Sequence, residues 1–154
     1  AEDLRLDRPR SRLYLGWAAE LHEVALSFAH TDFHKHGAYL VRHADLYGFS
    51  RGGQALVATL IRTHRGKLSP ELFDDMPEKD RKLARSLSML LRLAVRLRRN
   101  RSERPFPAIE LVAKKDRLTL TFPSGFLDRH PLTLEDLRIE AGRLAVLGFD
   151  LSIH

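Results

Sequence analysis

The chain of 154 residues contains no cysteine, which excludes disulfide bonds and thiolate zinc sites. It also has no run of about 18 apolar residues, the length that a membrane-spanning helix requires. The N-terminus carries no charged region followed by an apolar stretch, so it is not typical of a signal peptide. We therefore expect no membrane anchor and a reducing, cytoplasmic location.

A glycine-rich phosphate loop is also missing. The Gly52-Gly53 pair follows no predicted strand, so it is weak evidence for such a loop. An initiator methionine is missing as well, and we expect the chain to be a piece of a longer protein. Its length and its 44% hydrophobic content suffice for one sizeable core, or for two small ones that share an interface.

Positive charge is plentiful. The net charge is +6, and most of the excess lies between Lys79 and Arg104, against only Asp80 and Glu103. The cations of this basic run are Lys79, Arg81, Lys82, Arg85, Arg92, Arg96, Arg98, Arg99, Arg101 and Arg104. A solvated helix face explains the run, and so does a surface for phosphate groups, whose oxygens match the guanidinium fork.

The first two thirds of the chain show helical spacing of apolar residues. We predict helices over residues 9–29 and 37–44, from a Ser50 cap to about Gly66, and from Pro77 to Leu97. In the first helix we expect a core-facing stripe of Leu13, Trp17, Leu21, Val24 and Phe28. In the last, the expected stripe is Leu83, Leu87, Leu90, Leu91, Ala94 and Leu97.

The pattern changes after Pro105 and Pro107. Alternating apolar residues at 109–113 and 118–122 predict a hairpin that turns at Lys115-Asp116. A capping box of Thr133 and Asp136 then predicts a helix that Gly148 stops, followed by a last strand. The fold class is therefore α+β: a mostly α-helical domain over residues 1–104 and a small ββαβ unit over residues 105–154.

Five histidines (His22, His30, His34, His36 and His64) fall on the predicted helices and the turns between them. Together with Glu23, they suggest either a metal-binding phosphohydrolase core or hydrogen-bonded structural histidines. His34 and His36 flank Lys35 at the start of a helix, where backbone N–H groups and positive charge favour an anion.

Several separated segments resemble the C-terminal region of the exopolyphosphatase and guanosine pentaphosphate phosphatase family. They are A-A-E-L-H-E-V-A-L from Ala18, H-K-H-G-A-Y-L-V from His34, A-D-L-Y-G-F-S from Ala44, I-R-T-H-R from Ile61 and L-L-R-L-A-V-R-L from Leu90. The resemblance implies that the helical domain is similar to the HD phosphohydrolase superfamily. It also implies that hydrolysis occurs in two N-terminal actin-like domains that this chain lacks, with a divalent metal there and a homodimer as the assembly.

A working site of the HD type needs an early histidine, a His-Asp pair and a late aspartate around a divalent ion. Here the pair position carries His22-Glu23, and no histidine precedes it. The late aspartate is expected beside Ala94, where this chain has Val95 amid arginines. These three departures predict that the domain holds no catalytic metal or other cofactor.

Two functional hypotheses follow. The first is a non-catalytic domain that binds polyphosphate, or another phosphate-rich ligand, and supports dimerisation. Its anion-binding candidates are His34, Lys35, His36, Arg62, His64, Arg65, Lys67, Arg96, Arg98 and Arg99. The second is an independent metal-dependent phosphohydrolase acting on nucleotide phosphates, with His22, Glu23, His36 and His64 as metal ligands. Nucleic-acid binding ranks behind both, because no aromatic residues interleave the cations.

Overall fold

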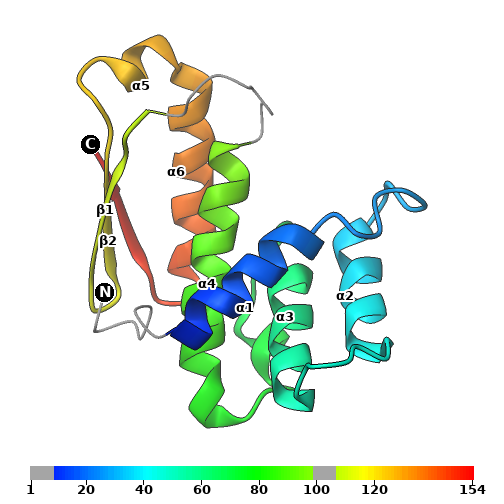
Figure 1. Ribbon diagram of the computed structural model, residues 1–154. Helices are drawn as coiled ribbons and strands as arrows, with labels where there is room; N and C mark the ends of the chain where they lie inside the picture. Colours follow the sequence, from blue (N-terminus) through cyan, green and yellow to red (C-terminus); the bar gives the residue numbers. More distant parts are fainter. Residues whose placement is uncertain (1–8, 99–106) are drawn as a thin grey trace.

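The structure, a computed structural model, describes residues 9–98 and 107–154 (Figure 1). The first part is helical, with α1 (Pro9–Leu21), α2 (Phe33–His43), α3 (Arg51–Thr63), the short 3-10 helix η2 (Pro70–Phe73) and α4 (Glu78–Leu97). The second part consists of β1 (Glu110–Lys114), β2 (Arg117–Thr121), α5 (Phe126–Arg129), α6 (Pro131–Ala145) and β3 (Asp150–Ile153). The α+β class is confirmed. The predicted boundary between residues 104 and 105 lies outside the described residues.

The small sheet has the strand order β1-β2-β3. The predicted hairpin is confirmed: β1 and β2 pair antiparallel, and Lys115 takes a positive φ of 54° in the turn. β3 runs parallel to β2, with Leu151 opposite Leu118. Two parallel neighbours need a crossover connection, which α6 supplies while packing against β3.

Helix α3 lies at the centre of the helical part and contacts α1, α2 and α4 (Figure 1). Its middle is buried on every side, so it presents no polar face to solvent. The predicted cap is confirmed, because the Ser50 hydroxyl accepts a hydrogen bond from the Gly53 N–H at 3.1 Å. This bond satisfies one of the N–H groups that a helix start leaves without a partner.

The prediction for the first helix is wrong in two respects. The helix ends at Leu21 and turns follow it, so it does not reach residue 29. Its buried residues include Tyr14 and Ala18, whereas Leu13 is half exposed and Phe28 is 63% exposed. The cause is a close approach between α1 and α3, because a Cβ on Gly53 would lie only 2.6 Å from the Tyr14 hydroxyl. The glycine admits the tyrosine ring and thereby fixes which face of α1 turns inward.

Two other helix starts differ from the prediction. Helix α2 begins at Phe33, four residues before the expected position, directly after Asp32 in the left-handed conformation. Helix α6 begins at Pro131, so Thr133 lies inside its first turn and the predicted capping box does not form. Proline suits this first position because its missing N–H has no helical partner there. The predicted stop is confirmed, with Gly148 at a φ of 87°.

Helix α4 is enclosed on three sides by α1, α3 and α6. Leu87 and Leu91 are buried as predicted, but Ala94 is exposed and the buried residues extend round the helix. Arg92, which the sequence placed in a solvated or phosphate-binding run, is 1% exposed. Among the described helices, none is both long and apolar enough to cross a bilayer.

Candidate anion-binding cleft

A cleft of about 810 Å³ lies where the turn after α1, the start of α2, the end of α3, α4 and α6 meet. We call it the histidine cleft. Its polar and charged lining includes His22, Glu23, Asp32, His34, His64, Arg65, Arg96, Arg98 and Arg143. Elements from both parts of the chain therefore contribute to one concave surface.

His64 is the most enclosed of these histidines, at the C-terminal cap of α3. Its Nδ1 lies 2.7 Å from the Ile61 carbonyl oxygen, a distance that suits a ring proton donated to this oxygen. Its ring lies 5.1 Å from that of His22 and 6.1 Å from that of His34. Burial is the main cause that lowers the His64 pKa to about 4. The ring is therefore neutral at physiological pH.

His34 is the second residue of α2 and is 7% exposed. Its Nδ1 is buried and has no hydrogen-bond partner among the described residues. Burial, followed by the charges of Arg62 and Arg65, lowers its pKa to about 4. A neutral imidazole with an unsatisfied nitrogen is a costly arrangement for structure alone.

His22 and Glu23 follow directly after α1. The His22 Nδ1 lies 2.7 Å from the Ala19 carbonyl oxygen, and its Nε2 lies 4.0 Å from the Glu23 carboxylate. Both side chains line the cleft, at the place where the resemblance puts a His-Asp pair.

Arginines also line the histidine cleft. The Arg65 guanidinium lies 4.7 Å from the centre of the Phe33 ring, a cation–π contact that holds it against α2. Arg96 comes from the last turn of α4 and Arg98 is its C-terminal cap, and Val95, directly before Arg96, also lines the cleft. Val95 thus occupies the wall where an aspartate was expected, and its side chain has no atom that can bind a metal.

The remaining candidates lie elsewhere. Lys35 bonds Asp32 at 2.8 Å and lines, with Arg62, a separate hollow of about 350 Å³ beside α2 and α3. His36 and Lys67 are exposed and line neither of these hollows. Arg99 lies outside the described residues. The ten candidate anion ligands therefore do not form a single site.

The alternative metal ligands are not brought together either. His22, Glu23 and His64 line the histidine cleft, whereas His36 does not. Within residues 9–98 and 107–154, no three histidine, aspartate or glutamate side chains are arranged so that they could hold a metal ion.

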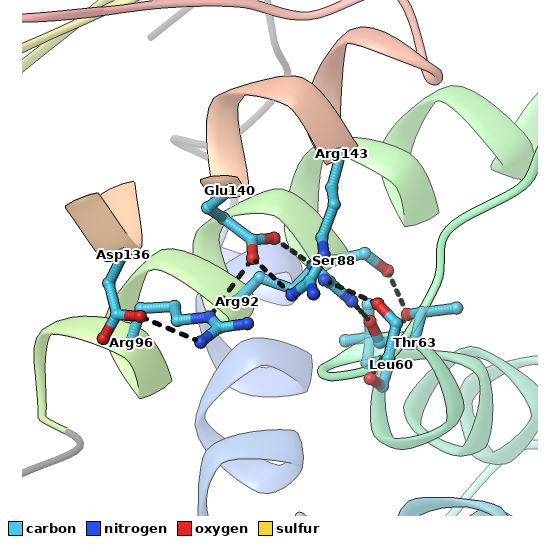
Figure 2. Close-up of polar contacts among 9 residues, drawn as sticks. Leu60, Thr63, Ser88, Arg92, Arg96, Asp136, Glu140 and Arg143 are labelled. Carbon is cyan, nitrogen blue, oxygen red and sulfur yellow. Dashed lines mark hydrogen bonds and ion pairs between the residues drawn. The ribbon is translucent and has the colours of Figure 1, made fainter. Parts of the chain in front are cut away.

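Sequence reasoning missed the polar network beside the cleft (Figure 2). Glu140 of α6 is fully buried, and its carboxylate accepts hydrogen bonds from Arg92 and Arg96 of α4. Arg143, one turn further along α6, lies 3.5 Å from the same carboxylate. Burial is the main cause that lowers the Arg92 pKa, and the bond to Glu140 opposes it.

Arg92 also reaches the end of α3. Its guanidinium donates hydrogen bonds to the carbonyl oxygens of Thr63 and Gly66, which flank His64 and Arg65 in sequence. A cation there satisfies carbonyls that a helix end leaves open and favours the negative end of the helix dipole. The signal for this network was available, because Glu140 lies between Leu137 and Leu144 on the buried stripe of α6.

Residues 2–141 match the family described as Ppx/GppA phosphatase, domain III. The chain belongs to this family. The match covers the helical part, most of α6 and all residues of the histidine cleft except Arg143, so the resemblance noted from the sequence is confirmed. The cleft therefore lies in domain III of this phosphatase family.

Relatives share the same span. A "Guanosine-5'-triphosphate,3'-diphosphate pyrophosphatase" of Vibrio cholerae is 35% identical over 151 residues, which are 97% of this chain and 30% of the relative. A protein of the same name from Pseudoalteromonas atlantica is 35% identical over 135 residues, or 88% of this chain and 27% of the relative. The chain thus spans less than a third of the length of these relatives.

Proposed function

We propose that this chain is the C-terminal part of an exopolyphosphatase-like phosphoanhydride hydrolase and binds a phosphate-rich ligand in the histidine cleft without hydrolysing it. The ligand is either polyphosphate or a guanosine polyphosphate, and the names of the relatives indicate the second of these. The single observation that carries the proposal is the composition of the cleft wall. Seven histidine and arginine side chains line the cleft against the two carboxylates of Glu23 and Asp32, and Val95 stands where the expected metal site would need an aspartate.

The chemistry of the cleft suits phosphate. Arg65, Arg96 and Arg98 supply planar guanidinium groups that can donate paired hydrogen bonds to phosphate oxygens. A bound anion would raise the pKa values of His64 and His34 from about 4. A ring that takes up a proton for this reason would attract the phosphate. A divalent cation would meet repulsion from the same arginines.

The proposal also assigns roles to the longer protein of which this chain is a part. We place hydrolysis, and the divalent metal it needs, in N-terminal actin-like domains, and we propose that the assembly is a cytoplasmic homodimer. This C-terminal part needs no cofactor of its own. Its role is to hold the phosphate chain while the catalytic domains cleave it.

The direct test is to titrate linear polyphosphate into the 154-residue chain at several salt concentrations. Because cations that bind a polyanion release its counterions, the affinity should fall steeply as salt rises. Undetectable binding at low ionic strength would end the proposal.

A matched pair of variants locates the ligand. Arg65→Gln removes a cation that lines the histidine cleft, whereas Lys67→Gln removes an exposed cation two residues away that does not. Arg65→Gln should weaken polyphosphate binding about tenfold, as expected for a charged hydrogen bond, and Lys67→Gln by less than about twofold. Equal losses would mean that the ligand follows overall charge and does not occupy the cleft.

The non-catalytic part of the proposal has its own measurement. Protein prepared without chelators should contain no stoichiometric manganese, iron, nickel or zinc. Stoichiometric metal that is lost in a His22→Ala or His64→Ala variant would instead support the alternative, an independent metal-dependent phosphohydrolase acting on nucleotide phosphates.

A further inference from the structure

Helix α6 belongs to the C-terminal unit, yet it contributes to the histidine cleft. We propose that α6 completes the anion site, with Arg143 as a phosphate ligand and Glu140 as a positioning residue for Arg96 and Arg143. This inference rests on the proposed function and adds residues from a part of the chain that sequence reasoning had not connected with the ligand.

The first support is the geometry around Glu140 (Figure 2). One carboxylate oxygen accepts a hydrogen bond from the buried Arg92, and the other lies 3.2 Å from Nε of Arg96 and 3.5 Å from a terminal nitrogen of Arg143. A single buried carboxylate therefore holds two arginines that line the cleft. Asp136 lies 3.6 Å from a second nitrogen of Arg96 and fixes that side chain further.

The second support is what these contacts leave available. A guanidinium has five N–H donors, and the contacts with Glu140 engage only one nitrogen each of Arg96 and Arg143. The N–H groups that face neither Glu140 nor Asp136 can meet phosphate oxygens. An arginine held in place beforehand also loses less conformational freedom when the ligand binds, which increases affinity.

The third support is the route from Glu140 to the opposite wall. Arg92 connects Glu140 to the Thr63 and Gly66 carbonyl oxygens, on either side of His64 and Arg65. Glu140 thus lies at the start of a chain of hydrogen bonds that reaches the α3 side of the cleft. A movement of α6 would therefore displace cleft residues on both the α6 side and the α3 side.

The ligand role of Arg143 is tested with two variants of the same helix. Arg143→Gln removes a cation from the cleft, and Arg138→Gln removes an exposed cation of α6 that does not line it. Both lower the net charge equally. Arg143→Gln should weaken polyphosphate binding about tenfold and lower the slope of log affinity against log salt by about one, while Arg138→Gln should do neither.

The positioning role of Glu140 is tested with Glu140→Asp, which keeps the charge but withdraws the carboxylate by one methylene. Loss of one charged hydrogen bond weakens binding about tenfold. Because Glu140→Asp only displaces the two arginines, the folded variant should bind polyphosphate about fivefold more weakly. A purely structural role would lower the melting temperature and leave the affinity of the folded protein unchanged. If Glu140→Asp does not fold, the double variant Arg92→Met/Glu140→Leu, which buries no charge, replaces it with the same expectation.

The outcomes separate the two proposals. If the wild-type chain does not bind polyphosphate, the proposed function fails. If it binds, and Arg143→Gln matches Arg138→Gln, then α6 is not part of the site. If it binds, and the folded variant of Glu140 retains full affinity, then Glu140 does not position the arginines.

Discussion

The guanidinium of Arg92 and the carboxylate of Glu140 form an ion pair that is closed to solvent and joins α4 to α6 (Figure 2). Removing two charges from water is costly, and their attraction offsets this cost only when the other polar atoms also find partners. Here they do, because Arg92 donates to the Thr63 and Gly66 carbonyl oxygens and Glu140 accepts from Arg96 as well. The pair therefore acts as a joint between the helical part and the C-terminal unit.

A double-mutant cycle measures the interaction free energy between Arg92 and Glu140. Arg92→Met alone and Glu140→Leu alone should each lower the free energy of unfolding by about 3–5 kcal/mol, because each leaves a buried charge without its partner. The double variant should lose far less than the sum, since it buries no charge. Urea unfolding followed by circular dichroism gives the three values. Additive losses would show that the two side chains do not depend on each other.

The approach of α1 to α3 is the basis of a second prediction. In Gly53→Ala the added Cβ would lie 2.6 Å from the Tyr14 hydroxyl and 2.7 Å from its ring. The ring must move against a packed core, so the variant should be less stable by about 1–3 kcal/mol.

Gly52 is the matched control, one residue earlier in the same helical turn. A Cβ there would meet no atom within 4 Å. Gly52→Ala should be neutral or more stable by up to about 1 kcal/mol, because alanine restricts the unfolded chain. Thermal melts of both variants decide the matter, and a stable Gly53→Ala protein would show that the contact with Tyr14 does not determine the face of α1.

Much of the fold could be predicted from local patterns. Alternation fixed the hairpin, Ser50 marked the start of α3, and Gly148 marked the end of the last helix region. Each of these signals is a property of a few neighbouring residues. The inward face of α1 was not predictable in this way, because it depends on Gly53, which lies far from it in sequence.

The candidate site shows the same division. His34, His64, Arg65, Arg96 and Arg98 do meet in one cleft, because they fall near helix ends that α3 and α4 bring together. Charge alone could not distinguish these cleft residues from Lys35 and Arg62, which line another hollow. Arg92 belongs to the same basic run as Arg96, and only its burial against α6 distinguishes a structural arginine from a cleft arginine.

The Ser50 cap yields a third prediction. Ser50→Ala removes the acceptor for the Gly53 N–H and should cost about 1 kcal/mol in the free energy of unfolding. Ser50→Asp restores an acceptor and adds a negative charge at the helix start, so it should recover the wild-type stability. An unaffected Ser50→Ala protein would mean that water replaces the side chain at no cost.

The buried histidines make stability depend on pH. The His64 pKa is about 4 in the folded protein and about 6.5 when unfolded, so the unfolded chain binds more protons between these values. The stability that depends on a neutral His64 ring is therefore fully present above about pH 6.5 and is lost as the pH falls toward 4, by about 3 kcal/mol. His34 changes in the same direction.

Urea unfolding at pH 7.5, 6 and 5 tests this dependence. His64→Asn should be less stable at pH 7.5, because it loses the contact with the Ile61 carbonyl, but its stability should fall less on acidification. His36→Asn, at an exposed position of α2, should keep the wild-type pH dependence. If His64→Asn and the wild type lose equal free energy between pH 7.5 and 5, then His64 is not the group that resists protonation in the folded state.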